Sequence, residues 1–183
     1  MSNNILQFET SYHGLRKIIS GGQDGVDLAG LAAAYDCGFD TGGHCPHFFK
    51  THSGPNLQLG IKYKLIETIS TGYPRRTELN VMNSDATLIF GSKLHSPGIA
   101  MTRKFCKQYN KKFWEVQLPF PIDMKSSTLY KKLIDWLNEN QVEVLNIAGN
   151  RDKNTRYGDH YHAVYFFLTG LFNTIKENKN VIK

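Results

Sequence analysis

The stretch 17–27, with the sequence KIISGGQDGVD, constrains the fold of this chain more than any other part of it. A short β-branched run ends abruptly in a glycine-rich turn, and a helical pattern rich in Ala and Leu begins at Val26. A strand, a glycine turn and a helix start in this order leave backbone N–H groups at a helix N-terminus, where the helix dipole attracts anions. Gly21 and Gly22 would let a ligand come close to the backbone. We expect a phosphate site here; the alternative is a turn that binds no ligand.

Short apolar runs alternate with longer helical patterns along the rest of the chain, and one segment, 44–72, has no regular pattern. Strands are predicted at 15–19, 39–41, 86–90, 113–118 and 142–147, and helices at 26–37, 75–82, 97–109, 127–140 and 160–175. Parallel neighbours need crossover connections, so this alternation predicts an α/β fold with a doubly wound, mostly parallel sheet and helices on both faces. A length of 183 residues suits a single domain spanning residues 1–183.

The charge balance and the cysteines limit the partners and the compartment. With 22 basic and 16 acidic residues the chain has a net charge of +6, which favours anionic partners. The basic residues are scattered and lack the interleaved aromatics of a single-strand binding surface, so nucleic-acid binding is not expected. Three widely spaced cysteines argue against a disulfide framework, and no stretch is long and apolar enough to cross a membrane. The N-terminal segment has no secretory signal pattern either, and we expect a cytoplasmic protein.

Four loops follow predicted strands, and in a doubly wound sheet they meet at one edge, where ligands bind. The first loop and the helix start after it supply the candidate ligand-binding residues Ser20, Gly21, Gly22, Gln23, Asp24, Gly25 and Asp27, and the second loop supplies Gly43. The third loop and its helix start supply Gly91, Ser92, Gly98 and Thr102, and the last loop supplies Asn146 and Arg151. We expect the anion to be held by backbone amides of the first loop, those of Gly21, Gly22, Gln23 and Gly25.

Two further candidates lie in the helix predicted at 75–82. An arginine at the N-terminal end of a helix gains nothing from the helix dipole, so a second role is expected for Arg76, either a phosphate contact or a salt bridge between subunits. Asn80 lies one turn later on the same face. Asp27, near the N-terminus of the first helix, either binds a ribose or another loop or has only a structural role. The dipole there is expected to lower the pKa of Asp27.

Histidines and a cysteine gather in the segment without a regular pattern, at His44, Cys45, His47 and His52. They lack the two ligand pairs of a structural zinc site, so no metal is expected. Cys45 is also a candidate nucleophile, but nothing in the sequence pairs it with a base.

The last predicted helix, 160–175, is apolar around most of its circumference. Such a helix must be buried on more than one side. One side can face the sheet of its own chain, and the other would then need a partner surface. The pattern predicts a homo-oligomer, a dimer or a tetramer, with deep burial within one subunit as the alternative.

The order of several motifs resembles a known family. The segments SGGQDGVDLAGLAAA, GFDTGGHCP, RRTELNVMNSDATLIF, SPGIAMT and VLNIAGNRD occur in the order found in the molybdenum cofactor carrier family, over residues 18–152. That family is Rossmann-like and is related to the DNA-processing protein A-like and lonely-guy phosphoribohydrolase domains. The resemblance implies a Rossmann-like, oligomeric binding protein. It also implies molybdenum cofactor as the ligand, a pterin with a terminal phosphate and an oxo-metal group.

The third loop departs from the pattern of that family. Where the family has a GGTALT-like sequence, this chain has PGIAMT, so that Pro97 removes a glycine and a backbone N–H and Ile99 removes a hydroxyl donor. The departure argues against anion binding at this loop, although Gly98 and Thr102 remain. The phosphoribohydrolase relatives carry a glutamate shortly after this glycine. Basic residues, Arg103 and Lys104, stand in that region here, which argues against the lonely-guy reaction.

These observations lead to two hypotheses about function. We expect a non-catalytic carrier or binding protein for an anionic, phosphate-bearing small molecule, either molybdenum cofactor or a nucleotide-like ligand. The alternative is a nucleotide hydrolase that cleaves an N-glycosidic or phosphate-ester bond, with Asp24 or Asp27 as general acid or base. The carrier is favoured because the other candidate residues orient and neutralise a ligand but do not readily exchange protons.

Overall fold

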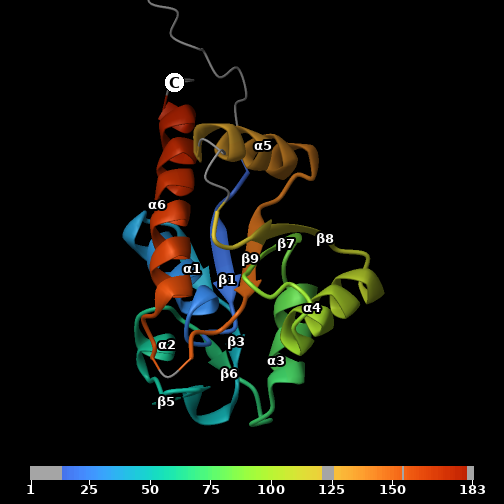
Figure 1. The fold of residues 1–183 in the computed structure, drawn as a ribbon. Helices are drawn as coiled ribbons and strands as arrows, with labels where there is room; N and C mark the ends of the chain where they lie inside the picture. The colour runs from blue at the N-terminus through green and yellow to red at the C-terminus, as the bar shows by residue number, and fades with distance from the viewer. Residues whose placement is uncertain (1–13, 121–125, 154, 181–183) are drawn as a thin grey trace, which may run out of the picture.

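The computed structural model describes residues 14–120, 126–153 and 155–180 (Figure 1). Its longer strands are β1 (Lys17–Ser20), β2 (Asp40–Gly42), β7 (Ala86–Gly91), β8 (Lys112–Gln117) and β9 (Val144–Gly149). Its longer helices are α1 (Val26–Asp36), α3 (Tyr73–Met82), α4 (Pro97–Gln108), α5 (Ser126–Glu139) and α6 (Asp159–Asn180). These elements confirm the predicted alternation, and α6 runs a further turn beyond its predicted end.

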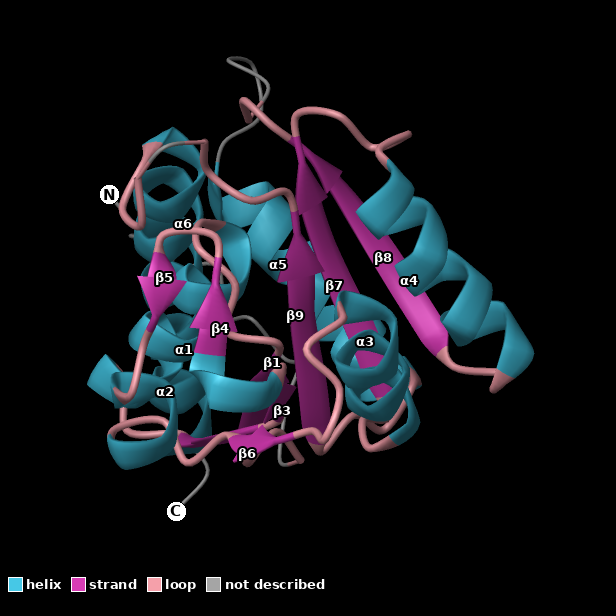
Figure 2. Ribbon diagram, turned by 90° about the horizontal axis from the view of Figure 1, so that it is seen from below, coloured by secondary structure: helices cyan, strands magenta, loops and turns pink. Residues whose placement is uncertain are grey.

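The longer strands form one parallel sheet of five strands in the order β2-β1-β9-β7-β8. Ile18 of β1 lies opposite Leu145 of β9, and Leu88 of β7 lies opposite both Ile147 of β9 and Trp114 of β8. The carboxyl ends of parallel strands share one edge, as the arrowheads of β7, β8 and β9 show in Figure 2. The sheet confirms the predicted Rossmann-like α/β fold.

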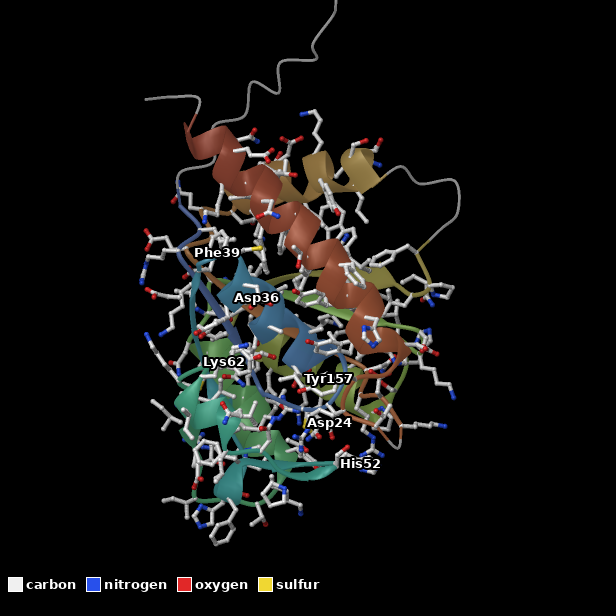
Figure 3. All side chains as sticks on the ribbon, turned by 90° about the vertical axis from the view of Figure 1, so that its left-hand side faces the viewer. Asp24, Asp36, Phe39, His52, Lys62 and Tyr157 are labelled. Atoms are coloured by element: carbon white, nitrogen blue, oxygen red, sulfur yellow. The ribbon has the colours of Figure 1, made fainter. Side chains whose placement is uncertain are left out.

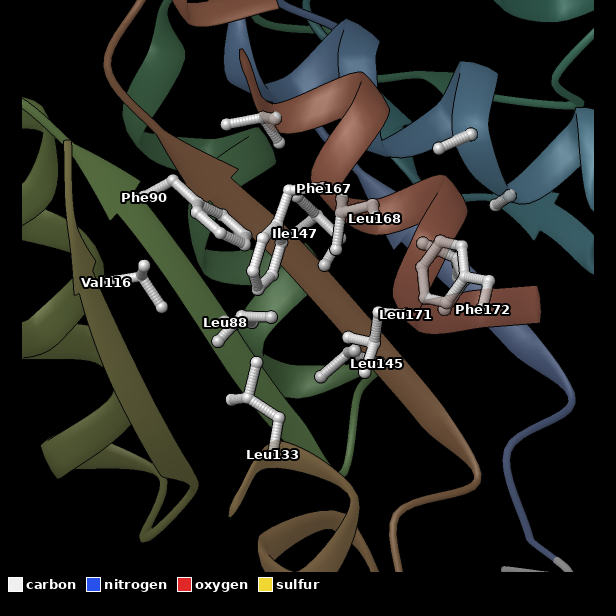
Figure 4. Packing of buried hydrophobic residues seen from close by; sticks show 14 of the residues in the cluster. Leu88, Phe90, Val116, Leu133, Leu145, Ile147, Phe167, Leu168, Leu171 and Phe172 are labelled. Carbon is white, nitrogen blue, oxygen red and sulfur yellow. The ribbon is translucent and has the colours of Figure 1, made fainter. Parts of the chain in front are cut away.

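Helices cover both faces of this sheet. α1, α5 and α6 pack together on one face, and α3 and α4 pack together on the other (Figure 1). The first face holds the larger core, in which Phe90 and Ile147 of the sheet meet Phe167 and Leu171 of α6 (Figure 4). All six residues of β7 are buried, as expected for a central strand that is covered on both faces.

The segment 44–72, which the sequence predicts as irregular, contains several short elements, so that prediction is wrong. They are β3 (His44–Cys45), a 3-10 turn (His47–Phe49), β4 (Lys50–Thr51), β5 (Gly54–Pro55), α2 (Gln58–Ile61) and β6 (Ile66–Glu67). β3 pairs in parallel with β6, and β4 pairs with β5 in a hairpin. A second apolar cluster, which includes Leu31 of α1 and Leu59 of α2, holds the segment against the sheet domain. Strands of two residues show no alternation that a sequence pattern could reveal.

The apolar residues of α6 are mostly buried within the subunit. Against α1, α5 and the sheet lie Val164, Phe167, Leu168, Leu171, Phe172 and Ile175, all buried. Phe166, by contrast, is 69% exposed. Burial inside the chain therefore accounts for most of the pattern from which a homo-oligomer was predicted, and the oligomer itself stays a prediction.

Two further features of the fold are its cysteines and the hydropathy of its helices. Cys37, Cys45 and Cys106 are all buried and form no disulfide. No helix within the described ranges is both long enough and apolar enough to cross a membrane. The fold is held by packing and hydrogen bonds rather than by covalent links between distant residues.

Candidate functional site

A pocket with a volume of about 840 Å³ opens at the carboxyl ends of β1, β7 and β9. Its walls come from the loops that follow these strands and from the first turns of α3, α4 and α6. The lining residues are Gln23, Asp27, Tyr73, Pro74, Arg76, Thr77, Ser92, Lys93, Ser96, Pro97, Gly98, Met101, Thr102, Ala148, Gly149, Asn150, Arg151, Asp152, Lys153, Thr155, Gly158, Asp159 and His160. Doubly wound sheets bind ligands at this edge, and the volume is that of a small-molecule site.

The pocket brings together fewer than half of the residues that the sequence predicts for a ligand site. Those that line it are Gln23, Asp27, Arg76, Ser92, Gly98, Thr102 and Arg151. Those that do not line it are Ser20, Gly21, Gly22, Asp24, Gly25, Gly43, Asn80, Gly91 and Asn146. The second group consists mainly of glycines and of side chains that are buried in hydrogen bonds to the protein itself.

The glycines of the first loop make room for protein atoms rather than for a ligand. A Cβ at Gly21 would overlap the guanidinium of Arg76, and a Cβ at Gly22 would lie 2.8 Å from the side chain of Leu59. Gly25 has φ +88°, and a Cβ there would lie 2.6 Å from the backbone N of Asp152. The glycine-rich turn is therefore a place where three segments of the chain approach one another closely.

Two of the four amides predicted to hold an anion have partners in the protein. The amide of Gln23 donates to Oδ2 of Asp27 at 3.4 Å, and the amide of Gly25 donates to the carbonyl of Arg156 at 3.4 Å. Both bonds are long, so an anion could compete for these donors. Two of the four predicted anion donors are thus engaged by the chain itself in this structure.

Asp24 and the side-chain oxygen of Gln23 fasten the first loop to the hairpin of β4 and β5. Asp24 is fully buried, accepts a hydrogen bond of 2.7 Å from the amide of Ser53 and forms an ion pair of 3.4 Å with Arg156. Oε1 of Gln23 accepts a hydrogen bond of 2.7 Å from the amide of His52. Figure 3 shows Asp24 near the segment that carries His52. Asp24 thus lies behind the pocket wall, where its contacts are structural.

Asp27 and Arg76 form a buried ion pair at the pocket wall. Nη1 of Arg76 lies 2.8 Å from Oδ2 of Asp27, and the two side chains are 13% and 4% exposed, respectively. Burial raises the pKa of Asp27, while Arg76 and the Gln23 amide oppose that rise. The prediction of a lowered pKa is wrong, because loss of hydration outweighs the stabilisation that a helix N-terminus offers. Of the roles predicted for Arg76, a salt bridge is present, but it lies within the subunit.

Two buried hydrogen-bond donors at the pocket have no acceptor among the described residues, Nε2 of Gln23 and Nε of Arg76. The amide of His52 can only donate, so the Gln23 atom that faces it is the oxygen and Nε2 is the remaining donor. Unpaired buried donors are costly. Both atoms are buried within the protein, so a ligand in the pocket does not reach them in this structure.

In the loop from β7 to α4, the space beside the glycine is open, whereas in the first loop it is occupied by other parts of the chain. Nothing lies within 4 Å of the position that a Cβ would take at Gly98. No side chain caps the N-terminus of α4, and Pro97 has no amide to satisfy. The first amides of a helix have no acceptor within the helix and lie at the positive end of its dipole. This helix start therefore offers an open anion site at the pocket.

Two lysines that line the pocket are unpaired among the described residues. Lys93 and Lys153 both line the pocket, and neither has a carboxylate partner within 4 Å in the described part of the chain. Asn150 fixes the loop: its Oδ1 accepts a hydrogen bond of 2.9 Å from the Lys93 amide, and its Nδ2 donates to Ser96 at 3.0 Å. The loop before α4 is thus held in place, and the pocket lining as a whole carries four Lys or Arg and three Asp side chains.

Ser92, His160 and Asp152 form a chain of hydrogen bonds on the pocket wall. Oγ of Ser92 lies 2.8 Å from Nε2 of His160, and Nδ1 of His160 lies 2.9 Å from Oδ1 of Asp152. The sequence predicted Ser92 as a ligand-binding residue and missed the other two. His160 is separated from Ser92 by 68 positions, and no local spacing signals that α6 begins beside the end of β7.

The remaining predicted polar residues hold the sheet edge together. Ser20 donates to the carbonyl of Ile147 at 2.6 Å, and Asn146 donates to Thr87 at 3.2 Å. Asn80 donates to the carbonyl of His44 and accepts from its amide, which anchors β3 to α3. These side chains complete the backbone pairing of neighbouring elements rather than face the pocket.

The candidate metal and nucleophile residues of the segment 44–72 have structural contacts. Burial raises the pKa of the Cys45 thiol to about 12, which makes it a poor nucleophile at neutral pH. His47 pairs with Glu67 at 2.9 Å. Within the described ranges, no three His, Cys, Asp or Glu side chains lie close enough together to hold a metal ion.

The parallel sheet with its helices on both faces and its pocket at the carboxyl edge defines a Rossmann-like α/β protein. A family model described as "Circularly permutated YpsA SLOG family" matches residues 18–170, and the chain belongs to this family. Its fold is similar to a crystal structure from Syntrophus aciditrophicus SB, described as "Putative molybdenum carrier protein", with a TM-score of 0.75 and 31% identity. That similarity covers 87% of this chain and 95% of the other. None of the curated proteins compared matches the chain.

Proposed function

We propose that this protein binds and carries an anionic, phosphate-bearing small molecule in the pocket at the carboxyl edge of the sheet. The observation that carries the proposal is the open N-terminus of α4 at Gly98, in a pocket that is also lined by Lys93 and Lys153, two lysines without a carboxylate partner in the described part of the chain. Helix N-termini and lysines bind phosphate through short, charge-assisted hydrogen bonds. Membership of the family, together with the description of the similar crystal structure as a "Putative molybdenum carrier protein", supports a carrier role.

We infer molybdenum cofactor as the ligand, because the similar crystal structure is described as a "Putative molybdenum carrier protein". Its terminal phosphate would lie at the first turn of α4, near Gly98 and Lys93. Its pterin ring, which carries a carbonyl oxygen and ring nitrogens as acceptors, would lie in the rest of the pocket. A nucleotide-like molecule with similar acceptors would fit the same features. The volume of about 840 Å³ lies within the usual range for sites of this kind.

The nucleotide hydrolase that depends on Asp24 or Asp27 has less support. Asp24 does not line the pocket and is already paired with Arg156 and the Ser53 amide. Asp27 lines the pocket, but its carboxylate binds Arg76 and the amide of Gln23. A general acid or base must reach the substrate with an oxygen that is free to exchange a proton. Both oxygens of Asp24 have partners, and Oδ2 of Asp27 accepts from both Arg76 and the Gln23 amide.

The proposal is tested by loading the full chain with molybdenum cofactor released from a molybdoenzyme under anoxic conditions. After desalting, molybdenum that stays with the protein is measured by elemental mass spectrometry. We expect stoichiometric retention by the natural protein and about tenfold weaker retention by Lys93→Glu, because that change puts a negative charge beside the phosphate.

Lys112→Glu is the matched control, because Lys112 is exposed at the amino end of β8, on the opposite edge of the sheet. It changes the net charge of the protein by the same amount and is expected to retain the cofactor. No retention by the natural protein, or equal losses in the two variants, would overturn the proposal.

We also propose a cytoplasmic location. It is supported by the three cysteines, which are buried and free of disulfides, as suits a reducing compartment.

A further inference from the structure

The hydrogen-bonded chain of Ser92, His160 and Asp152 has the order of a nucleophile, a base and an orienting carboxylate. The two links measure 2.8 Å, from Ser92 Oγ to His160 Nε2, and 2.9 Å, from His160 Nδ1 to Asp152 Oδ1. Both lie within hydrogen-bonding distance, and all three residues line the pocket. Nothing in the proposed carrier function requires such a chain.

The contacts of Asp152 fix which nitrogen of His160 carries the proton. Asp152 is 4% exposed, and it accepts backbone amides from Gly158, His160 and Tyr161 at 2.9–3.0 Å. Three amide donors hold this buried carboxylate in place. The carboxylate can only accept, so Nδ1 of the neutral imidazole carries the proton and Nε2 accepts from the Ser92 hydroxyl.

Ser92 is placed where a substrate could reach it. It follows the last residue of β7, its side chain is exposed to the pocket, and its carbonyl accepts a hydrogen bond of 3.3 Å from Gln117. The residue is thus anchored through its backbone while its hydroxyl stays accessible. Gly98, at the uncapped start of α4, lines the same pocket and has open space beside it. The first amides of α4, which have no acceptor within the helix, therefore belong to the same pocket as the Ser92 hydroxyl.

We propose that Ser92 is the nucleophile of a second activity of this pocket, the hydrolysis of carboxylic esters that carry a negative charge. His160 Nε2 takes the proton of the Ser92 hydroxyl as Oγ bonds to the ester carbonyl carbon. The bond from that carbon to the alcohol oxygen breaks, and the alcohol leaves with the proton from His160. Water then attacks the acyl carbon and gives a proton to His160. The bond to Oγ breaks, Ser92 regains its proton, and the carboxylic acid leaves.

The negative charge on the substrate rests on the proposed function, because it depends on Lys93 and Lys153 as anion-binding groups. The assignment of Ser92 as the nucleophile does not depend on the proposed function. Asp152 also caps the start of α6 and would be a poor first target for substitution. Ser92 and His160 are the informative positions, because the side chain of Ser92 is exposed and that of His160 is 23% exposed.

The test uses the full chain and a neutral fluorophosphonate probe, which reacts with activated serines. Peptide mass spectrometry is expected to locate the label at Ser92. Ser92→Ala is expected to abolish labelling, and His160→Gln to slow it by at least about a hundredfold, because the base is lost. Ser70→Ala removes an exposed serine outside the pocket and is expected to label like the natural protein. Circular dichroism checks that each variant is folded.

Absence of label at Ser92 in the natural protein, or equal labelling of folded His160→Gln, would overturn the assignment of the nucleophile. Hydrolysis of p-nitrophenyl succinate monoester and p-nitrophenyl acetate then tests the charge. We expect the succinate ester to be hydrolysed faster, with the advantage lost in Lys93→Glu. Equal rates for the two esters would overturn the anionic substrate class, while leaving the nucleophile assigned. Failure to retain molybdenum cofactor would instead contradict the carrier function alone.

Discussion

The loop from β1 to α1 and the loop from β7 to α4 lie at the same edge of the sheet and use glycine for opposite purposes. The first contains Gly21, Gly22 and Gly25, and the space beside each of them is occupied by other parts of the chain. The second contains Gly98, which has nothing within 4 Å of the place of its missing Cβ. The loop with more glycines is packed shut, and the loop with fewer is open to the pocket.

This difference shows what a glycine-rich turn does and does not reveal. A glycine at such a position indicates that something approaches the backbone closely or that φ is positive. It does not indicate whether the approaching group is a ligand or the protein. In the first loop it is the protein, since Arg76 stands against Gly21 and the backbone of Asp152 stands against Gly25.

The largest effect is expected from Gly25→Ala, which tests the packed loop. The change places a Cβ 2.6 Å from the backbone N of Asp152, at a residue with φ +88°. The left-handed backbone costs about 2 kcal/mol and the overlap about 2 kcal/mol more, so we expect the free energy of unfolding to fall by about 4 kcal/mol. Urea denaturation measures it. An unchanged midpoint would show that the loop is not packed as described.

A somewhat smaller loss is expected from Asp27→Ala, which removes the partner of Arg76 behind the same loop. The guanidinium stays charged and 13% exposed with no carboxylate beside it, which we expect to cost about 3 kcal/mol in urea denaturation. Glu143→Ala is the control, because its ion pair with Arg16 is exposed and is expected to contribute less than about 1 kcal/mol. Similar losses in both variants would contradict the buried character of the first pair.

The smallest effect on stability is expected from Gly98→Ala, the counterpart of Gly25→Ala in the open loop. The new methyl group meets no atom within 4 Å, and alanine suits a helix better than glycine does. We expect the free energy of unfolding to stay within about 1 kcal/mol of its original value, with any change a gain. A loss comparable to that of Gly25→Ala would erase the distinction between the two loops.

The sequence was a good guide to the parts of the fold that repeat a pattern. β7 could be predicted as a buried strand from a short apolar run that contains Thr87 and Ile89 and ends at a glycine, and α5 as a helix from its amphipathic period. It failed in the segment 44–72, where two-residue strands are paired by tertiary contacts. The sequence also predicted the wrong direction for the pKa of Asp27. Burial of the carboxyl raises this pKa, and that burial comes from the packing of segments that are distant in sequence, such as the one that carries Arg76.

Part of the candidate site could be predicted because it depends only on the order of strands and helices. The alternation of strands and helices places Gln23, Ser92 and Arg151 at one sheet edge without knowledge of the structure, and all three line the pocket. The contacts that give the site its chemistry were not predictable. His160 meets Ser92 only because α6 starts beside the end of β7, and Gly98 is open only because no other segment fills the space beside it.

The account depends most on the claim that anions bind at the start of α4 and not in the glycine-rich turn. Crystals soaked in tungstate, a tetrahedral oxyanion with a strong anomalous signal, locate the preferred site directly. We predict an anomalous peak beside Gly98, within reach of Lys93, and its loss in crystals of Lys93→Glu. A peak at the turn of Gly21, Gly22 and Gly25, with none at α4, would contradict the account.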